Sequence, residues 1–487
     1  MKKKIALIPI DNRPVCYDLL LQTSEIDHNI ELLLPPIHLL GDLNKIADIN
    51  QILSWLDNLK DVHSIIVSLD TIAYGGLIPS RRSSDSFETV KSRIDSFFSI
   101  INKKNICVYA FSSIMRISDN NINDEEKEYW KDYGKLIFDF SYNYSKSFKS
   151  FDYDNFSSYS CIKSKIPQDI LQDYINTRNR NFLINIYYIN LAKNNNLIKK
   201  LIFSKDDCAQ YGLNILEAEE LCFRITQSNI NAIVKTGADE IPFSLLSLAY
   251  LNLKNTKLSN NGLKIATIFS FPESISKVSN YEDVSVFESI KSQIEIIGSE
   301  YISDDIYNAD LILVINNFKS SQGEIVMGIE NESSLFKIPR TVFNKPFFIV
   351  DILNANGADF NFVLHNLDVF SHKNFYGFSA WNTTSNALGS AISCAVFKLL
   401  ANLSSSYNDL AFKKLQTIRL LDDWAFQSNV RQKIRSLYPI FNNDLDLLKQ
   451  KMNPFESIIL ESLDTCFNNI SYSYPWNRYF ELRCYIL

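Results

Sequence analysis

Two adjacent carboxylates, Asp206 and Asp207, follow the short apolar run Ile198–Phe203. Placing two neighbouring carboxylates beside a buried segment costs desolvation and mutual repulsion unless they have a task or a cation. Acid–base catalysis is a task that such carboxylates can perform. The alternative is structural, with one Asp capping the helix that includes Ile215–Ile225 and the other solvated. We predict that the pair is catalytic and keep capping as the alternative.

A second acidic pair, Asp239-Glu240, follows the apolar run Ala232–Val234 and a turn at Gly237. Its position is like that of the first pair, so it is a second candidate for catalysis. Capping and the favourable interaction of carboxylates with a helix N-terminus explain the same residue types. Which acidic pair is catalytic stays open.

Further polar side chains follow other apolar runs and are candidates for substrate binding. Gly75-Gly76 could let backbone N–H groups approach a ligand, although the pattern is not a phosphate-loop motif, and a plain tight turn is the alternative. For Asp11 and Arg13, which follow the first apolar run, the alternative to substrate binding is a buried, structural Asp–Arg pair. The predicted substrate-binding residues are Asp11, Arg13, Asp70, Tyr74, Arg81, Arg116, Asn316, Asn317, Asp351, Asn356, Trp381 and Asn382.

Trp381 and Asn382 indicate what the substrate could be. An aromatic wall beside amide groups suits a sugar, because sugar C–H faces stack on rings and hydroxyls need hydrogen-bonding partners. A packed Trp followed by a helix N-cap is the alternative. A polyhydroxylated substrate is therefore predicted.

Eight apolar runs of strand length must position these residues, and helical stretches such as Ile49–Leu59 and Val90–Ile101 separate most of them. Runs of this length, bounded by polar clusters, are typical of strands buried on both faces in a parallel sheet. The runs are Ile5–Ile10, Ser64–Leu69, Ile106–Phe111, Ile198–Phe203, Ala232–Val234, Lys264–Phe269, Asp310–Ile315 and Pro346–Val350. Alternating strands and helices predict an α/β fold, and the count favours a (β/α)8 TIM-like barrel over an open sheet. Ligands bind at the carboxyl ends of the strands in either fold.

Two stretches depart from this alternation. About eighty residues separate the third and fourth runs, which is too long for a plain connection, so we expect a helical insertion at about 120–196. After residue 390 the sequence is mainly helical, with stretches at 391–403, 409–435 and 457–467. We therefore predict a catalytic barrel at 1–390 and a helical region packed on it at 391–487.

Several kinds of chemistry lack support in the sequence. The five histidines show no zinc-ligand spacing, no GxGxxG opens a helix and no GxSxG elbow is present, so we expect neither a metal nor a cofactor. Net charge is −6 with scattered Lys and Arg, which does not favour nucleic acid. The N-terminal apolar run is shorter than a signal-peptide core, and no run approaches a membrane span. Eight cysteines without CxxC pairs fit a reducing cytoplasm. Oligomeric state stays open.

Several motifs resemble signatures of an uncharacterised bacterial family, a domain of unknown function. They are Ile8–Pro14, Ser68–Gly76, Ser113–Arg116, Asp206-Asp207 with Tyr211-Gly212, Gly237–Glu240 and Gly377–Thr383. The resemblance runs from Ile5 to beyond Trp476 and implies no activity.

A second resemblance does imply an activity. The Asp-Asp pair after the fourth run, the later amides and Trp381-Asn382 are similar to O-GlcNAcase and hyaluronidase-type β-N-acetylglucosaminidases. That resemblance implies that Asp206 polarises the substrate's acetamido group and that Asp207 is the general acid/base. It also implies that Asn316 or Asn317 lines the sugar subsite. Ser204-Lys205 and the second acidic pair depart from the pattern.

Three classes of function follow from these residues. The leading hypothesis is a glycoside hydrolase acting on a sugar, in which either an acetamido group or a second carboxylate assists. One alternative is a hydrolase or lyase that binds Mg²⁺ or Ca²⁺ through Asp206, Asp239 and Asp351. The other is a non-catalytic carbohydrate-binding protein. In each case the partner is a small molecule or an oligosaccharide.

Overall fold

Short runs of buried, often β-branched residues form the strands of two separate parallel sheets. The structure, a computed structural model, describes residues 2–150, 153–206, 209–254, 262–329, 331 and 335–486. The chain divides into two compact units. Unit 1 comprises Met1–Lys3, Arg13–Leu32 and Pro242–Leu487, and unit 2 comprises Lys4–Asn12 and Leu33–Ile241.

The sheet of unit 2 holds strands whose residues are mostly buried. Its parallel strands, in spatial order, are β1 (Lys3–Ile8), β3 (Val62–Ser68), β4 (Cys107–Ile114), β5 (Ile198–Lys205) and β6 (Ala232–Thr236). The sixth strand, β2 (Ile30–Leu33), is at the edge of the sheet. Because the strands are parallel, the polar groups that follow them meet at one edge.

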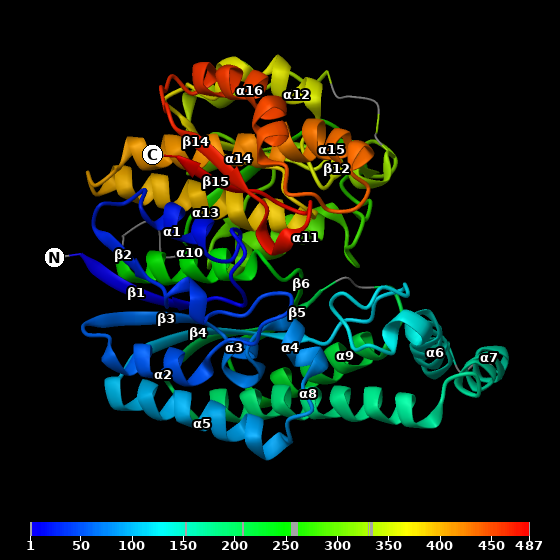
Figure 1. Cartoon of the computed structure of the whole chain (residues 1–487). Helices are drawn as coiled ribbons and strands as arrows, with labels where there is room; N and C mark the ends of the chain where they lie inside the picture. The colour runs from blue at the N-terminus through cyan, green and yellow to red at the C-terminus, as the bar shows by residue number, and fades with distance from the viewer. Residues whose placement is uncertain are drawn as a thin grey trace. The chain divides into compact units, whose positions relative to one another are not determined.

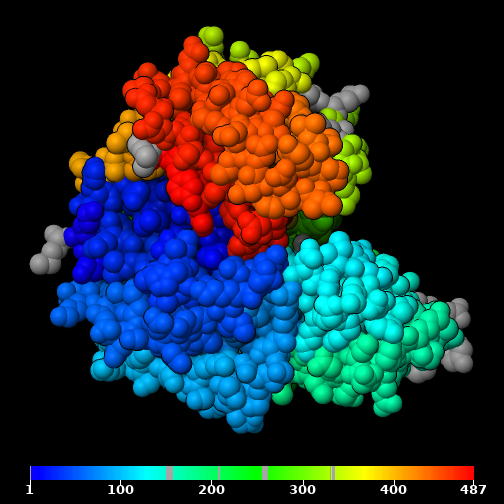
Figure 2. All heavy atoms as spheres, viewed as in Figure 1, coloured from blue at the N-terminus to red at the C-terminus, as the bar shows by residue number. Residues whose placement is uncertain are grey.

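Helices alternate with these strands, as the sequence pattern predicts. They are η1 (Ile37–Leu39), α2 (Ile49–Asn58), α3 (Leu69–Tyr74), α4 (Leu77–Arg82), α5 (Phe87–Lys104), α6 (Trp130–Ser150), α7 (Tyr153–Lys163), α8 (Gln168–Asn194) and α9 (Leu213–Ser228). In Figure 1, α2, α5 and α8 lie along one face of the sheet. The interval predicted as an insertion contains α6, α7 and α8. Helix α8 packs along the sheet, and the cyan atoms of the interval's first part project from this unit in Figure 2.

The turn between α3 and α4 requires its two glycines. Gly75 has φ +88° and Gly76 has φ +135°, backbone conformations that side chains disfavour. A Cβ on Gly75 would lie 2.3 Å from Ile46 Cγ2, so the segment around Ile46 packs directly on this turn. The tight-turn interpretation of Gly75-Gly76 accounts for both residues.

The sheet of unit 1 has five parallel strands. In spatial order they are β13 (Phe375–Ser379), β11 (Phe347–Asp351), β9 (Leu311–Asn316), β7 (Lys264–Phe269) and β8 (Glu300–Tyr301). Two small ladders accompany it: β10 (Gly323–Glu324) pairs with β12 (Asn354–Ala355), and β14 (Ile470–Ser473) pairs with β15 (Arg483–Ile486).

Helix α13 packs on β11 and β13 and also contacts α1 and α11, whereas α12, α15 and α16 contact η6. The α-helices are α1 (Asp18–Ser24), α10 (Ile241–Lys254), α11 (Val286–Ile296), α12 (Phe360–His365), α13 (Thr384–Leu403), α14 (Asp409–Arg419), α15 (Arg431–Leu437) and α16 (Leu445–Ser462). A π-helix, η6 (Leu420–Val430), joins α14 to α15. The short 3-10 helices are η2 (Pro272–Ser274), η3 (Ile325–Met327), η4 (Arg340–Asn344), η5 (Leu367–Val369) and η7 (Pro475–Asn477).

Among the described residues, α13 is the one helix long and apolar enough to cross a membrane. Its most apolar window is 83% buried, which is typical of a core helix.

The α/β class predicted from the sequence is confirmed. Each of the eight predicted runs overlaps a strand, and β13 is a further parallel strand that was not predicted. Trp381 therefore follows β13 rather than the last predicted run. The described strands form sheets of six and five strands, and they do not show a closed barrel.

Candidate functional site

Five of the predicted polar groups lie at the carboxyl edge of the sheet in unit 2. Asp11 follows β1, Asp70 follows β3, Arg116 follows β4, Asp206 follows β5, and Asp239-Glu240 follows β6. Asp207, the other half of the leading pair, lies outside the described residues.

Asp206 belongs to a charged group that we call the Arg81 cluster, which consists of Arg81, Arg116, Glu125, Glu126 and Asp206. Arg81 Nη2 lies 3.3 Å from Asp206 Oδ2, and Arg116 Nη1 lies 3.6 Å from the same oxygen. Arg116 Nη2 also binds Glu125 Oε2 at 2.8 Å. Glu126 Oε1 lies 3.4 Å from both Arg81 Nη1 and Arg116 Nε. Three carboxylates thus share two guanidinium groups.

The members of the Arg81 cluster differ in access to solvent. The Arg81 and Glu126 side chains are 1% and 4% exposed, whereas those of Glu125 and Asp206 are 22% and 21% exposed. The buried half fixes the geometry, because a buried ion pair has few alternative arrangements. Glu125 and Asp206 are thus the carboxylates of the cluster with the most access to solvent.

Asp70, which follows β3, is almost completely buried. Its Oδ2 accepts a hydrogen bond of 2.8 Å from the backbone N–H of Ser113, at the end of β4. Burial raises the pKa of Asp70 to about 7, against the lowering effect of hydrogen bonds from Ser113 and of the Arg81 charge. Ser113 Oγ in turn accepts from Ser204 Oγ at 3.4 Å, which extends the polar contacts to β5.

The second acidic pair is tied to β6. Glu240 Oε1 lies 3.6 Å from Lys235 Nζ, and both side chains are buried. Gly237 has φ +107°, and a Cβ there would lie 2.0 Å from Glu240 Oε1. The carboxylate of Glu240 thus lies over the glycine turn, and Asp239 beside it is also buried. An ion pair with Lys235 accounts for the burial of Glu240 without a catalytic role.

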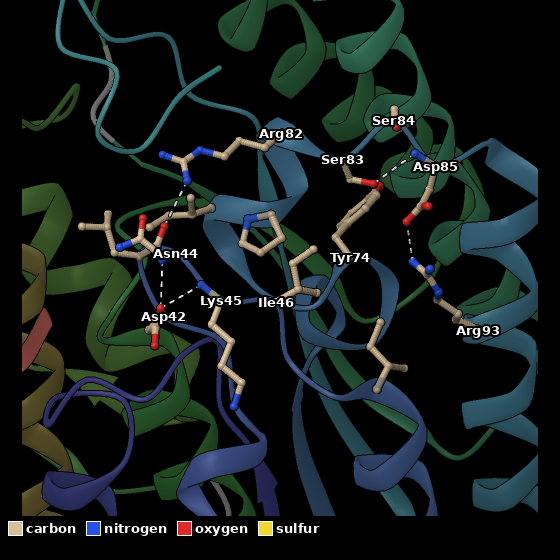
Figure 3. Close-up of a pocket in the computed structure, with 14 residues that line it drawn as sticks. Asp42, Asn44, Lys45, Ile46, Tyr74, Arg82, Ser83, Ser84, Asp85 and Arg93 are labelled. Atoms are coloured by element: carbon tan, nitrogen blue, oxygen red, sulfur yellow. Dashed lines mark hydrogen bonds and ion pairs between the residues drawn. The ribbon is translucent and has the colours of Figure 1, made fainter. Parts of the chain in front are cut away.

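Tyr74 is at the end of α3, where the Arg180 guanidinium lies 5.0 Å from its ring centroid. Tyr74 also lines a pocket of about 420 Å³ in unit 2, shown in Figure 3, together with parts of the 42–46 loop, α4 and α5. Several polar groups at this pocket already have partners. Arg82 Nη1 donates to Leu43 O at 3.0 Å, and Arg93 Nη1 donates to Asp85 Oδ2 at 2.7 Å.

The other predicted binding residues lie in unit 1. Asn316 and Asp351 end β9 and β11, where they are register partners. Asn316 Nδ2 donates to Asp351 Oδ1 over 3.0 Å. Asn317 is engaged by the backbone of Phe271, donating to its carbonyl at 2.8 Å and accepting from its N–H at 2.9 Å. These two hydrogen bonds stabilise the local backbone, so they explain the position of the Asn317 side chain without a ligand.

Asp351 accepts two further hydrogen bonds from the backbone. The N–H of Leu353 donates to Oδ1 at 3.1 Å, and the N–H of Asp359 donates to Oδ2 at 2.7 Å. Burial, and then the charge of Asp359, raise the pKa of Asp351 to about 8, while these hydrogen bonds act in the opposite direction. The side chain organises the turn after β11.

Asn356 and Asn382 meet through the backbone, since Asn356 N donates to Asn382 O at 2.8 Å. Both have left-handed backbone conformations, with φ +62° and +60°. Asn356 Nδ2 donates to both carboxylate oxygens of Glu324 at 3.0 Å. Trp381 is buried against Phe480, with ring centroids 6.0 Å apart. Arg13, also in unit 1, places its guanidinium 5.2 Å from the centroid of the Trp476 ring.

A family model for proteins of unknown function, DUF4127, matches residues 5–484 of the chain. The chain belongs to this family. A search of the curated proteins finds no match. For this DUF4127 member, the predicted resemblance to an uncharacterised family is confirmed at the level of the family. The individual motifs and the likeness to glycosidases stay predictions.

Several residues of the DUF4127 chain that surround these sites were not predicted. In unit 2 these are Glu125 and Glu126, which the sequence shows as part of an ordinary polar stretch between β4 and α6. In unit 1 they include Asp422 and Asp423 on η6, another Asp-Asp pair, which lies in a stretch predicted only as helical. Asp423 Oδ2 accepts from Ala380 N at 2.7 Å and contacts Arg419. A carboxylate pair in an otherwise apolar helical segment was the available signal.

The described residues do not form an evident metal-binding site. No group of three or more His, Cys, Asp or Glu side chains in the described parts of the chain could hold a metal ion. The carboxylates of the Arg81 cluster are instead opposed by arginine. That arrangement suits binding of a polar substrate and proton transfer to or from it.

Proposed function

We propose that this DUF4127 member is a glycoside hydrolase whose catalytic carboxylates include Asp206 of the Arg81 cluster. The observation that carries the proposal is that Asp206 and Glu125, both partly exposed, contact the same guanidinium group of Arg116. Glycoside hydrolysis uses two carboxyl groups beside one glycosidic bond, or one carboxyl pair and a substrate acetamido group. Carboxylates held by one arginine are near enough to serve one bond.

Two assignments of the reaction are compatible with this site. In the first, Asp206 orients and polarises a 2-acetamido group, and Asp207 donates a proton to the glycosidic oxygen. In the second, Asp206 and Glu125 divide the roles of acid and base, and a 2-acetamido group is not needed. Two measurements distinguish these assignments: the preference for 2-acetamido substrates, and the activities of the Asp207→Asn and Glu125→Gln variants described below.

The proposal includes the remaining expectations from the sequence. The substrate is a small molecule or an oligosaccharide, and the enzyme acts in the cytoplasm without a nucleic-acid or membrane partner. The proposal also keeps the expected closed (β/α)8 barrel, which the described sheets do not show.

The test is hydrolysis of a panel of chromogenic glycosides, including N-acetyl-β-glucosaminides and uncharged hexosides, with and without EDTA. Asp206→Asn should lower kcat/KM by about a hundredfold or more, the usual size of an acid–base contribution. Loss in Asp207→Asn but not in Glu125→Gln supports the acetamido route, and the converse supports the two-carboxylate route.

The matched control is Glu128→Gln. Glu128 lies on the same loop, its side chain is 76% exposed, and it contacts Lys131 rather than the cluster. This variant should retain wild-type activity. The proposal is wrong if the wild type cleaves no glycoside, or if Asp206→Asn is as active as Glu128→Gln. Loss of wild-type activity on EDTA addition would favour the metal-dependent alternative instead.

A further inference from the structure

The pocket shown in Figure 3, which we call the Tyr74 pocket, lies wholly within unit 2. Its volume of about 420 Å³ is within the range of about 300–1,000 Å³ that small-molecule sites occupy. Apolar side chains form much of its lining, and Ile46 among them is 59% exposed. The apolar lining residues are Leu43, Ile46, Ile49, Ile78 and Pro79. These side chains favour a ligand with an apolar body.

The glycine turn between α3 and α4 lets the 42–46 loop form one wall of the Tyr74 pocket. Ala47 N donates to Gly75 O at 3.0 Å. A Cβ on Gly75 would lie 2.3 Å from Ile46 Cγ2, so the Ile46 side chain occupies the space that a larger residue would need. The loop therefore packs directly on the turn, and the absence of a side chain at Gly75 gives this wall its position.

Two arginines hold the walls of the Tyr74 pocket in place through backbone carbonyl groups. Arg82 Nη1 donates to Leu43 O at 3.0 Å, which holds the 42–46 loop against the end of α4. Arg180, on α8, donates through Nη1 to Ser83 O at 2.6 Å and to Asp85 O at 3.0 Å. The walls are therefore ordered by the protein itself, and a ligand loses little affinity to ordering them.

The charged side chains that line the Tyr74 pocket already have partners within the protein. Arg93 Nη1 lies 2.7 Å from Asp85 Oδ2. Lys45 Nζ and the Arg82 guanidinium donate to backbone carbonyl groups, and Asp42 Oδ1 accepts from two backbone N–H groups at 2.8 Å. A charged ligand would compete with these contacts and would also lose its own hydration. The pocket therefore favours an uncharged ligand.

The Tyr74 hydroxyl is a buried polar group of this pocket that lacks a hydrogen-bond partner. Tyr74 is 3% exposed, and its hydroxyl makes no hydrogen bond among the described residues. The Arg180 guanidinium lies 5.0 Å from the Tyr74 ring centroid, but a guanidinium has only five N–H donors. Those of Arg180 bond twice to Asn181 Oδ1 and once each to the carbonyl oxygens of Ser80, Ser83 and Asp85.

This hydroxyl can act as a donor to a ligand. Burial raises the pKa of Tyr74, against the lowering effect of the Arg180 charge, so the phenol keeps its proton. In Figure 3 the ring extends toward Ser83, which also lines the pocket. Buried polar groups without a partner are rare because they are costly, and an acceptor oxygen on a bound molecule would remove that cost.

We propose that the Tyr74 pocket binds a small, uncharged ring compound that presents an acceptor oxygen, such as a carbonyl oxygen, to the Tyr74 hydroxyl. The apolar walls take the ring, and the single hydroxyl fixes its orientation, as a few polar groups do in largely apolar ligand sites. The proposal does not depend on the glycosidase proposal, because Arg81 and Asp206 do not line this pocket.

The experiment is a ligand-observed NMR titration of the full chain with three probes of similar ring size. Benzamide is uncharged and has an acceptor oxygen, benzoate is charged, and toluene has no acceptor. Benzamide should bind, and benzoate and toluene should each bind about tenfold more weakly or worse. Tyr74→Phe should weaken benzamide binding by about tenfold and leave toluene binding unchanged, because it removes one hydrogen bond and no apolar surface.

Tyr174→Phe is the matched control, since Tyr174 belongs to the same unit, is 1% exposed and does not line the pocket. It should bind benzamide like the wild type. Thermal melting checks folding, and Tyr74→Phe should melt no lower than the wild type because the hydroxyl that it removes has no partner.

Three results would overturn the proposal: no binding of benzamide, equal binding of benzamide and benzoate or toluene, or equal benzamide binding by the Tyr74→Phe and Tyr174→Phe variants. Asp206→Asn should bind benzamide like the wild type. Benzamide binding therefore tests this pocket whether or not the protein cleaves a glycoside.

Discussion

Asn316 and Asp351 lie opposite each other on β9 and β11, and the amide of Asn316 donates to Asp351 Oδ1 over 3.0 Å. Burial holds the proton on Asp351 until about pH 8, whereas an unfolded chain releases it near 3.8. Between these values the unfolded state binds fewer protons, so rising pH favours unfolding. Stability from this group is therefore full below pH 3.8 and is lost as the pH rises through about 8.

An Asp351→Asn variant isolates this effect because Asn does not titrate. We expect the free energy of unfolding of the wild type, relative to the variant, to decrease between pH 5 and pH 8. Urea denaturation of both proteins at several pH values in this window measures the difference. A difference that stays constant with pH would contradict the assignment. The variant should also lose one acceptor for the three donors around Asp351, at a cost of about 1–3 kcal/mol.

Gly237 and Glu240 provide a second prediction. A Cβ on residue 237 would lie 2.0 Å from Glu240 Oε1, and all three of its nearest contacts are atoms of the Glu240 carboxyl group. Gly237→Ala should therefore destabilise the protein by displacing Glu240 from Lys235, in addition to the strain of a positive φ. The expected loss is about 2–4 kcal/mol, above the ~1 kcal/mol for strain alone.

Gly328→Ala is the matched control for the Gly237 variant. Gly328 also has a positive φ, +69°, but a Cβ there meets no atom within 4 Å, so only the strain applies. In a Glu240→Ala background, Gly237→Ala should cost no more than Gly328→Ala. Urea denaturation of the single and double variants gives the coupling between the two residues. Additive effects would show that Glu240 does not constrain this turn.

Strand positions were predictable because a buried strand shows its apolar run locally. The run Lys264–Phe269 coincides with β7, and the runs before Asp70 and Asp206 each contain most of a strand. Strand β13 was missed because Gly377 interrupts its short sequence, Phe375–Ser379. The structure explains that glycine, since a Cβ there would lie 3.1 Å from Cys394 Sγ on α13.

The grouping of strands and the composition of the sites were less predictable. Which strands share a sheet depends on pairing between distant segments, and an apolar run carries no information on its neighbours. Glu126 looks like a solvated residue of a charged loop, but in the fold it is 5% exposed beside two arginines. Arg81 and Asp206 were predicted for separate roles, and the sequence indicated neither their contact nor the two glutamates of the cluster.

The last prediction concerns Arg81, whose side chain is 1% exposed and whose guanidinium contacts Glu126 and Asp206. Arg81→Met should remove the charge and leave Glu126 buried with Arg116 as its remaining cationic contact in the cluster. Breaking a buried ion pair by deleting one partner costs about 3–5 kcal/mol, because it leaves a buried charge uncompensated. Arg224→Met is the control: its ion pair with Glu220 on α9 is exposed, and its loss should cost at most about 0.5 kcal/mol. Adding Glu126→Gln to Arg81→Met should recover part of the loss, because it removes the uncompensated charge. Urea denaturation of the four proteins measures these differences, and equal effects of the Arg81 and Arg224 variants would mean that the cluster does not stabilise unit 2.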